Sequence, residues 1–333
     1  MAITLAVDAM SGDVGVAVTV PSSVRFLRDY PDAKIFLVGD KRVLQKALKK
    51  YNLQDKSRLQ IFHASQVVGM DELPQVALRN KKDSSMRIAI DLVKENQVQA
   101  IISSGNTGAL MAMAHFILKM LPNIRRPAIA KLIPRKHGVT CALDLGANID
   151  ATPEQLLKFG VMGSELMRAT EQIKSPKVGL LNIGTENTKG HEAIQKAHLL
   201  MQSSDLNYHG YVEGNDLFSG IVDVVVTDGF TGNVALKTSE GLARMISNIL
   251  RDELSKTWWR RCCALVSLSA LQSFKMRLDA RCYNGASLLG LQGIVVKSHG
   301  GADEVGFYFA LVQAYTEVRD HIIEHIAQHA KKM

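Results

Sequence analysis

The chain has few cysteines, and they show no metal-binding or disulfide pattern. Four occur among 333 residues, at positions 141, 262, 263 and 282, with no C-x-x-C spacing and no group of histidines nearby. Such spacing argues against a zinc site and against the disulfide framework of a small secreted protein. Carboxylates and histidines elsewhere also lack metal-ligand spacing. We therefore expect a reducing compartment, no metal and no cofactor.

Long apolar runs are also missing. No window reaches about 18 uninterrupted apolar residues, the minimum for a membrane-spanning helix. The first residues enter a strand pattern, ITLAV, without the basic and apolar regions of a signal peptide. Hydrophobic residues make up 47% of the chain and charged residues 22%, as in ordinary globular proteins. We expect a cytoplasmic protein with a single α/β domain over residues 1–333.

Several catalytic signatures are absent. No G-x-G-x-x-G follows the first predicted strand, which weakens a nicotinamide-binding assignment. A P-loop and a G-x-S-x-G elbow are also missing, so neither a P-loop kinase nor a serine hydrolase is supported. The net charge of +8 would suit an anionic lipid or an acidic protein partner. No nucleic-acid-binding motif accompanies this charge, so we expect no nucleic acid partner.

Short β-branched runs alternate with helical patterns along the chain, which predicts a mostly parallel sheet with helices on both faces. The predicted strands are 4–7, 34–38, 59–62, 100–103, 128–133, 139–143, 178–181, 207–212, 222–227 and 294–296. Strands 128–133 and 139–143 are expected to form a hairpin. Predicted helices include one with Pro21 in its first turn, one capped at Asp83-Ser84, one from Thr152-Pro153, one from Thr188 and a long one from Asp303, while 64–75 is expected to be a loop.

Two similar corners join a strand to a helix through small residues. Ser104-Gly105-Asn106-Thr107-Gly108 follows one strand, and Asp228-Gly229-Phe230-Thr231-Gly232-Asn233 follows another, with the second helix expected to begin at Val234. The first N–H groups of a helix have no intrahelical partner and carry partial positive charge. Such corners suit phosphate. The alternative is an ordinary tight turn of an α/β domain.

Polar residues gather where the predicted strands end: Asp8, Ser103, Asp144, Asn182, Asp228 and Lys297. In open α/β sheets, ligands bind beyond the carboxyl ends of the strands. We therefore expect the site to be a ring of strand exits. Because these residues include no covalent nucleophile with its base, they suit a transfer in which the substrates supply nucleophile and leaving group.

At these exits the chain closely resembles the bacterial phosphate acyltransferase (acyl-carrier-protein:phosphate acyltransferase, PlsX) family. The matching stretches are DAMSGD from Asp8, KDSSM from Lys82, SSGNTGA from Ser103, RPA from Arg126, DLGAN from Asp144, LNIGTE from Leu181 with Lys189-Gly190, TDGFTGNV from Thr227 with Leu236-Lys237-Thr238, YNGA from Tyr283 and KSHG from Lys297. In order, they cover nearly the whole chain. The departures from the family pattern are small: Ser11 stands where the family usually has Gly, Val16 where it has Pro, and Ser104 where it has Ala.

The resemblance implies transfer of a long-chain acyl group from the thioester of acyl carrier protein to inorganic phosphate, which yields acyl phosphate for phospholipid synthesis. It also implies a homodimer, no metal, and a fold like that of isocitrate/isopropylmalate dehydrogenases and phosphotransacetylases. The product would pass to a membrane glycerol-phosphate acyltransferase.

The site hypothesis assigns phosphate and the developing oxyanion to N–H groups around Asn106–Gly108 and Thr231–Asn233. The candidate catalytic residues are Asn106, Asp228, Asn233, Lys297 and His299, of which Lys297 and His299 could add positive charge or protonate the departing thiolate. The candidate binding residues are Asp8, Gly12, Asp13, Ser103, Gly105, Thr107, Gly108, Asp144, Asn148, Asn182, Gly184, Thr185, Glu186, Lys189, Gly229, Thr231, Gly232 and Lys237.

Several of these residues also have a purely structural explanation. His299 could be a structural turn histidine, Asp228 could only cap its helix, and Asp144 and Asn148 could be loop residues. Other functions also stay open. A phosphotransacylase that uses a coenzyme A thioester would need similar phosphate chemistry, and a non-catalytic scaffold could bind lipid or carrier protein. A dehydrogenase has only fold analogy in its support, which is weak evidence.

Residues 254–281 differ from the rest of the chain. This segment holds both tryptophans, Trp258 and Trp259, and the cations Lys256, Arg260, Arg261, Lys275, Arg277 and Arg281 around an apolar middle that includes Leu265. Such a pattern is typical of an interfacial amphipathic helix. A dimer arm is the equal alternative, and the cations could also receive the acidic carrier protein. We expect peripheral membrane contact or dimerisation through this basic helical arm.

Overall fold

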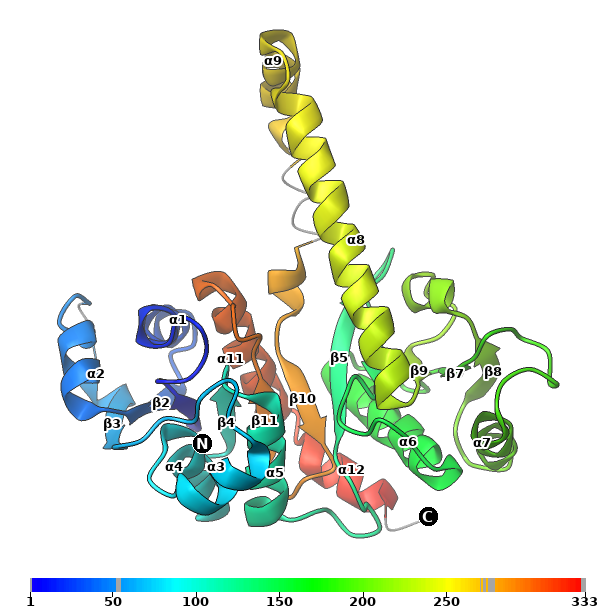
Figure 1. The fold of residues 1–333 in the computed structure, drawn as a ribbon, viewed down its shortest axis with the longest axis horizontal. Coiled ribbons are helices and arrows are strands. Elements are labelled where there is room, and N and C mark those ends of the chain that lie inside the picture. Colours follow the sequence, from blue (N-terminus) through cyan, green and yellow to red (C-terminus); the bar gives the residue numbers. More distant parts are fainter. Residues whose placement is uncertain (1, 52–54, 270, 272–273, 275–278, 331–333) are drawn as a thin grey trace.

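The computed structural model describes residues 2–51, 55–269, 271, 274 and 279–330. Eleven strands form one sheet in the order β3-β2-β1-β4-β11-β10-β5-β6-β9-β7-β8 (Figure 1). The strands are β1 (Ile3–Asp8), β2 (Ala33–Gly39), β3 (Leu59–His63), β4 (Ala100–Ser103), β5 (Ala128–Pro134), β6 (Val139–Leu143), β7 (Val178–Leu181), β8 (Tyr208–Val212), β9 (Val224–Val226), β10 (Ala286–Leu289) and β11 (Ile294–Lys297).

Most neighbouring strands of this sheet are parallel, as predicted. Antiparallel pairing occurs at its centre, where β10 pairs with β11 and β5 and where β5 forms the expected hairpin with β6. As a result, β6, β9 and β7 run opposite to β1, β4 and β11. A twist of about 20–25° per strand over the five steps from β4 to β9 turns these two sets by about 100–125°. The carboxyl ends of β11 and β9 face a common cleft, since His299, which follows β11, and Glu240, on the helix that follows β9, line one cavity.

Helices cover both faces of the sheet because successive strand residues point to opposite sides. Leu5 and Val7 face one core with α1, α6 and α11, whereas Ala6 faces the other core with α4 and α5. The helices are α1 (Val16–Asp29), α2 (Lys41–Leu48), α3 (Pro74–Asn80), α4 (Ser85–Lys94), α5 (Thr107–Leu118), α6 (Pro153–Thr170), α7 (Glu192–Gln202), α8 (Gly229–Ser255), α9 (Trp258–Val266), α11 (Glu304–Arg319) and α12 (Ile322–Ala330).

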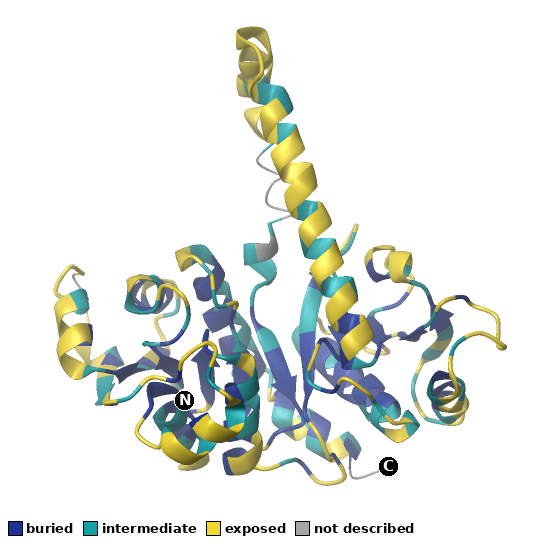
Figure 2. Cartoon of the chain, in the orientation of Figure 1, coloured by how far each residue is buried: buried dark blue, intermediate teal, exposed yellow. Residues whose placement is uncertain are grey.

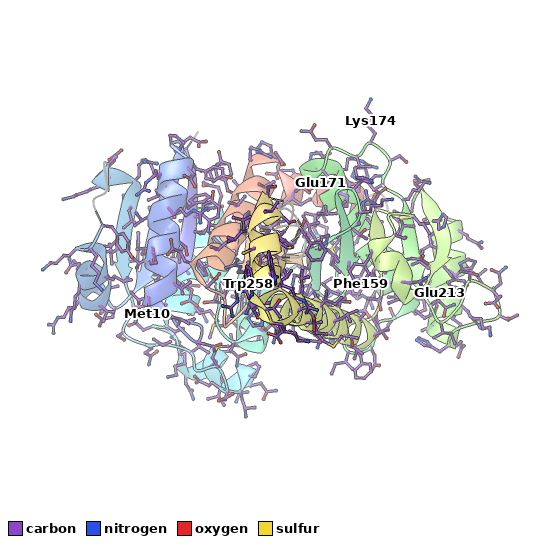
Figure 3. All side chains as sticks on the ribbon, turned by 90° about the horizontal axis from the view of Figure 1, so that it is seen from above. Met10, Phe159, Glu171, Lys174, Glu213 and Trp258 are labelled. Atoms are coloured by element: carbon purple, nitrogen blue, oxygen red, sulfur yellow. The ribbon has the colours of Figure 1, made fainter. Side chains whose placement is uncertain are left out.

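One helix leaves this body. The 27 residues of α8 extend for about 40 Å at 1.5 Å per residue. Only Gly229 and Gly232 of this helix are buried, and the remainder, which is exposed or half-buried, rises from the body (Figure 2). The short helix α9 packs beside its far end. Seen from above, Trp258 lies at the tip, over the middle of the body (Figure 3).

Several local predictions were right. Ser84 caps α4 by accepting a hydrogen bond from the N–H of Arg87 at 3.3 Å. Thr152 begins α6 with a reciprocal capping box to Gln155, and Pro153 occupies the first helical turn. In both places a short polar side chain satisfies an N–H group that the helix itself leaves unpaired.

Other local predictions were wrong. Pro21 lies inside α1, because that helix begins at Val16 after Gly15, whose φ of 55° suits glycine. The helix predicted from Thr188 begins at Glu192, after a turn in which the N–H of Lys189 bonds to the carbonyl of Glu186 at 3.0 Å. The single long C-terminal helix is two helices, α11 and α12, separated at His321 with φ 52°. The sequence reading missed α3 and β10, which are short.

Candidate functional site

Asp8 organises the exits of β1 and β4. Its carboxylate is fully buried and accepts a hydrogen bond from Ser103 Oγ at 2.7 Å, and the same hydroxyl accepts from the N–H of Gly105 at 3.1 Å. Burial raises the pKa of Asp8, whereas nearby hydroxyls, including those of Ser11 and Ser85, oppose the shift. Only the Ser103 contact has full hydrogen-bond geometry, so the other Asp8 oxygen and the Ser11 and Ser85 hydroxyls have no partner among the described residues.

Lys297 ends β11 directly beside Ser103 of β4. Its Nζ donates to the carbonyl of Ser104 at 3.4 Å and to the carbonyl of Ser298. Burial lowers the pKa of Lys297 to about 8, although the charges of Asp8 and Asp13 oppose that shift. A free thiol has a pKa of about 8.5. The ammonium group is therefore matched to proton exchange with a thiol near neutral pH.

Three loops meet at this point because glycines allow close approach. A Cβ on Gly12, which has φ 89°, would lie 2.5 Å from Ser104 Oγ and 3.1 Å from the carbonyl of Gly300. Ser104 Oγ donates to the carbonyl of Ser11 at 2.9 Å, and the N–H of Asp13 donates to that of Gly300 at 3.0 Å. Two of the departures from the family pattern, Ser11 and Ser104, thus contact each other. The exits of β1, β4 and β11 form one compact wall.

His299 lies on the same wall and is held by neighbours. Its N–H donates to Asn284 Oδ1 at 3.1 Å, and its Nδ1 accepts from the N–H of Gly301 at 3.1 Å. Burial lowers the pKa of His299, and the nearby charge of Lys237 adds to the shift. The sequence reading missed Asn284 as a site residue, although it lies in the YNGA motif. Its Nδ2 donates to Ser298 Oγ at 2.8 Å and therefore holds the loop after β11 in place.

The β4 corner has the predicted strand, loop and helix. Asn106 caps α5, since its Oδ1 accepts from the N–H of Ala109 at 2.9 Å. Its Nδ2 donates to the carbonyls of Met70 and Glu72 at 2.6 and 3.0 Å. The amide of Asn106 is therefore occupied in positioning the corner. Thr107 and Gly108 form the first turn of α5, where N–H groups point beyond the helix end.

The β9 corner differs from the prediction. Asp228 caps α8 by accepting from the N–H and the hydroxyl of Thr231, each at 2.8 Å. The helix consequently begins at Gly229 instead of Val234, and the N–H of Gly232 bonds to the carbonyl of Asp228 at 2.9 Å. The N–H groups of Thr231 and Gly232 are thus already paired, which corrects the assignment of this segment as a second set of anion donors. Asn233 lies in the first turns of α8, close to Gly146.

Asp144 organises the exit of β6. Its buried carboxylate accepts from the N–H groups of Ile129, Ala147 and Asn148 at 2.9, 3.0 and 2.7 Å. Asn148 also donates its side-chain amide to Asp144 at 2.8 Å and to the carbonyl of Pro127 at 2.8 Å. Burial raises the pKa of Asp144, and these N–H donors oppose the shift. Both residues are engaged in holding the loop.

The loop after β7 is self-contained. Asn182 donates to the carbonyl of Lys189 at 3.2 Å, and a Cβ on Gly184 would meet the side chains of Glu186 and Lys189. Thr185 lies in the same loop. No hydrogen bond or ion pair joins these residues to Lys297 in the part of the chain that the structure describes. The structure brings Asp8, Gly12, Asp13, Ser103, Gly105, Lys297 and His299 together, and leaves Asn182, Gly184, Thr185, Glu186 and Lys189 as a separate group.

Charged residues of α8 and β5 lie across the cleft from the exits of β1, β4 and β11, where Lys297 is located. Glu240 bonds to Lys131 Nζ at 2.9 Å and to Lys237 Nζ at 3.2 Å. The charge of Lys237 lowers the pKa of both Lys297 and His299, so the two sides lie within electrostatic reach. The sequence reading included Lys237 but missed Lys131 and Glu240. The spacing of Lys237 and Glu240 on one helix face was the available signal.

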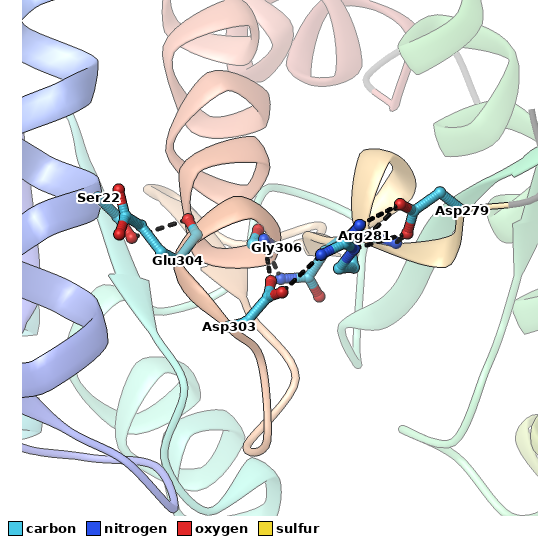
Figure 4. Close-up of polar contacts among 7 residues, drawn as sticks. Ser22, Asp279, Arg281, Asp303, Glu304 and Gly306 are labelled. Atoms are coloured by element: carbon cyan, nitrogen blue, oxygen red, sulfur yellow. Dashed lines mark hydrogen bonds and ion pairs between the residues drawn. The ribbon is translucent and has the colours of Figure 1, made fainter. Parts of the chain in front are cut away.

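A cavity of about 1030 Å³ opens from this cleft and continues along α8. His299, Gly301 and Glu240 line its inner end, and Leu254 and Leu265 line its outer end. Arg281 fixes its side wall: it binds Asp279 and donates to Asp303 at 2.7 Å, and Asp303 caps α11 through the N–H of Gly306 (Figure 4). The base of the arm is thereby attached to α11.

The arm itself exposes a mixed surface. Trp258 and Trp259 stack with ring centroids 3.7 Å apart, and Leu265 is 69% exposed. Arg260 binds Glu253 at 2.5 Å, and Arg261 donates to the carbonyl of Ser255 at 3.0 Å. Lys275 and Arg277 lie outside the described residues. Within the described ranges, every helix is too short or too polar to cross a membrane.

Comparison with known proteins identifies close relatives. A family model described as fatty acid synthesis protein matches residues 3–325. A phosphate acyltransferase from Chromobacterium violaceum is 58% identical over 332 residues, which cover 100% of this chain and 96% of the relative. A phosphate acyltransferase from Legionella pneumophila is 53% identical, covering 97% of this chain and 94% of the relative.

Solved structures agree in fold at low identity. A phosphotransacetylase from Streptococcus pyogenes aligns with a TM-score of 0.66 and 16% identity, over 95% of this chain and 94% of that chain. A 4-hydroxythreonine-4-phosphate dehydrogenase from Klebsiella pneumoniae aligns with a TM-score of 0.57 and 12% identity, over 97% and 100%. These likenesses confirm the predicted fold class.

Proposed function

This chain belongs to the fatty acid synthesis protein family and is an acyltransferase with phosphate as acceptor, and on that premise we propose that its donor is long-chain acyl-acyl carrier protein. The observation that carries the site assignment is the half-buried ammonium of Lys297 beside the β4 corner. A cation and the N-terminus of α5 together favour a phosphate at this place.

The reaction needs positioning more than covalent catalysis. A phosphate oxygen attacks the thioester carbonyl, the carbon–sulfur bond breaks, and acyl phosphate and a thiol form. The N–H groups of Thr107 and Gly108 would hold phosphate at the start of α5, and Asn106 would keep that helix end in place. Because the N–H groups of Thr231 and Gly232 are paired, the donors for the oxyanion are assigned to the Lys297 side.

Lys297 has two tasks in this scheme. In its charged form it stabilises the developing oxyanion, and it then gives a proton to the departing thiolate. Its lowered pKa, about 8, makes that transfer easier than from an ordinary lysine. His299, held by Asn284 and Gly301, would line the thioester side of the cleft.

The arm extends the proposal to partners. On its outward side α8 exposes Leu242, Met245, Ile246 and Ile249, which are 41–53% exposed and lie at helical spacing. An apolar stripe of this kind suits a second copy of the chain, so we assign the homodimer contact to it. Trp258, Trp259 and Leu265 at the tip suit peripheral contact with an anionic membrane that holds the enzyme consuming acyl phosphate.

Donor comparison tests the function. The enzyme is incubated with phosphate and either palmitoyl-acyl carrier protein or palmitoyl-coenzyme A, and acyl phosphate is trapped as its hydroxamate. We expect hydroxamate that depends on phosphate and a kcat/KM at least tenfold higher with the carrier protein. A preference for coenzyme A would establish the alternative phosphotransacylase, and no hydroxamate with either donor would favour the non-catalytic scaffold.

A further inference from the structure

We propose that the cavity along α8 is the binding groove for the acyl chain, that the chain lies with its thioester end in the cleft, and that the groove's outer end limits chain length. This inference rests on the proposed function. It names the place of the hydrocarbon, which the site at Lys297 does not provide, because the contacts of that site are polar.

The groove changes character along its length. Its inner end meets the site at His299, Gly301 and Glu240. Its outer half is lined by Leu250, Leu254, Leu265, Leu268, Leu271 and Phe274. A polar inner end that leads into an apolar outer end matches a thioester with a hydrocarbon tail. The polar side chains of Arg251, Ser255 and Arg261 also line this half. We assign the hydrocarbon to its leucine and phenylalanine side, and a pantetheine arm is the alternative that the test below distinguishes.

Helical spacing gives α8 two different faces. Ala243, Leu250 and Leu254 are the half-buried positions that line the groove. Leu242, Met245 and Ile249 are exposed and lie on the opposite side, since each residue advances the helix by about 100°. A second copy of the chain on the outward face would therefore leave the groove open.

The length of the groove fits a long acyl chain. Glu240 and Leu254 are 14 positions apart, which spans about 21 Å along α8. A carbon–carbon bond of about 1.5 Å advances an extended chain by about 1.25 Å, so 16 carbons need about 19 Å. The cavity of about 1030 Å³ is also large enough for a ligand of this class.

The outer end opens where the tip is most apolar. Leu265 and Leu268 are 69% and 47% exposed, and Phe274 is 43% exposed. Arginines 244 and 251 lie exposed at the rim, where their charged heads stay in water while their stems extend the apolar wall. A chain longer than the groove would emerge among these apolar side chains.

A ladder of substitutions tests the groove. Ala243→Trp, Leu250→Trp and Leu254→Trp place an indole at increasing distances from the cleft, and Asp252→Trp is the matched control because Asp252 is exposed and lies outside the lining. Rates are measured with octanoyl, dodecanoyl and palmitoyl donors on one carrier protein. Binding of the fluorescent fatty acid cis-parinaric acid is measured in parallel.

We expect each variant to accept a shorter acyl chain than the one before it, in the order Leu254→Trp, Leu250→Trp, Ala243→Trp, because the indole lies progressively closer to the cleft. For Leu254→Trp we expect kcat/KM with palmitoyl donor to fall at least tenfold and the octanoyl value to stay within twofold, with the control unchanged throughout. A chain-length profile that does not move would overturn the proposal. An equal loss at every length would assign the groove to the pantetheine arm, and a changed oligomeric state alone would assign it to a second copy.

The groove can be tested even if the proposed function is wrong. If the unsubstituted enzyme makes no acyl phosphate from any donor, cis-parinaric acid still decides the groove. Binding that Ala243→Trp weakens at least tenfold supports a hydrocarbon site, and absence of binding contradicts it.

Discussion

The β4 and β9 corners look alike in sequence, yet they do different work in the fold. At the β4 corner, Asn106 caps α5, whose inward residues Ala109, Leu110 and Met113 are fully buried. At the β9 corner, Asp228 caps α8, which buries only Gly229 and Gly232 before it leaves the body. The same strand–cap–helix chemistry therefore forms the proposed anion-binding corner in one place and the base of an arm in the other.

The difference comes from neighbours outside the two motifs. The β4 corner lies beside β11 and β1, which bring Lys297 and buried Asp8 to it. The β9 corner lies beside β6, and the carbonyls of Asp144 and Asn148 lie so close to its glycines that a side chain there would clash. Our proposal therefore places phosphate at the β4 corner, where a cation and unpaired N–H groups lie together, and not at every short glycine-bearing loop.

The largest effect should come from removing the cation of the β4 corner. Lys297→Met is expected to lower kcat by about 10²–10⁴-fold, since it removes both oxyanion stabilisation and a proton donor. Lys237→Met, a lysine across the cleft on the β9 side, is the matched control and should cost less than tenfold. Circular dichroism checks that both variants stay folded. Equal losses would mean that the two corners share the chemistry.

A second test breaks the close contact at the β9 corner. A Cβ on Gly232 would lie 2.0 Å from the carbonyl of Asp144, so Gly232→Ala should lower the free energy of unfolding by about 3 kcal/mol. Gly241→Ala is the control on the same helix, because a Cβ there meets nothing within 4 Å. This substitution should raise the free energy of unfolding by at most about 1 kcal/mol. Urea denaturation measures both. Similar stabilities would show that α8 can shift away from Asp144 freely.

The two helix caps should contribute differently to the free energy of unfolding. Asn106→Ala removes the cap of α5 and two bonds to the 70–72 loop, and should cost about 2 kcal/mol. Asp228→Ala removes only the cap of α8 and should cost about 1 kcal/mol. Thermal unfolding of both variants compares them. A larger loss at Asp228 would reverse the ranking of the two corners.

The smallest expected effect is a pH dependence on the β4 side. Lys297 is charged below its pKa of about 8 and neutral above it, so kcat/KM should fall about fivefold from pH 8 to pH 9. Lys297→Arg keeps its charge through this range and should lose the alkaline limb. The measurement is a pH–rate profile of both enzymes at saturating phosphate. An alkaline limb that persists in Lys297→Arg would assign it to another group.

The sequence predicted the repeating elements better than their assembly. The ends of strands such as Val139–Leu143 and Val178–Leu181 were predicted correctly because each mostly apolar run stops at a polar residue, Asp144 or Asn182. Periodicity could not show that β10 reverses the sheet direction at its centre, since β10 has only four residues. It also could not show that the helix begins at Gly229, because a glycine can lie in a loop or in a capped first turn.

The candidate site was likewise predicted only in part. Asp8, Ser103 and Lys297 were expected together as strand exits, and strand pairing brings them together. Asn182 and Lys189 were expected with them, but they bond to each other. Lys131 and Glu240 were missed because they meet only through tertiary packing of β5 against α8. The groove along α8 depends on the packing of α9 and of residues 279–306 near that helix, which no local pattern encodes.

The most direct test of the account is the position of phosphate in a crystal of the enzyme soaked in inorganic phosphate. We predict one phosphate within hydrogen-bond distance of Lys297 Nζ and of the N–H groups of Thr107 and Gly108 at the start of α5. Phosphate bound at the start of α8 instead, with the β4 corner empty, would contradict the assignment of the chemistry to Lys297.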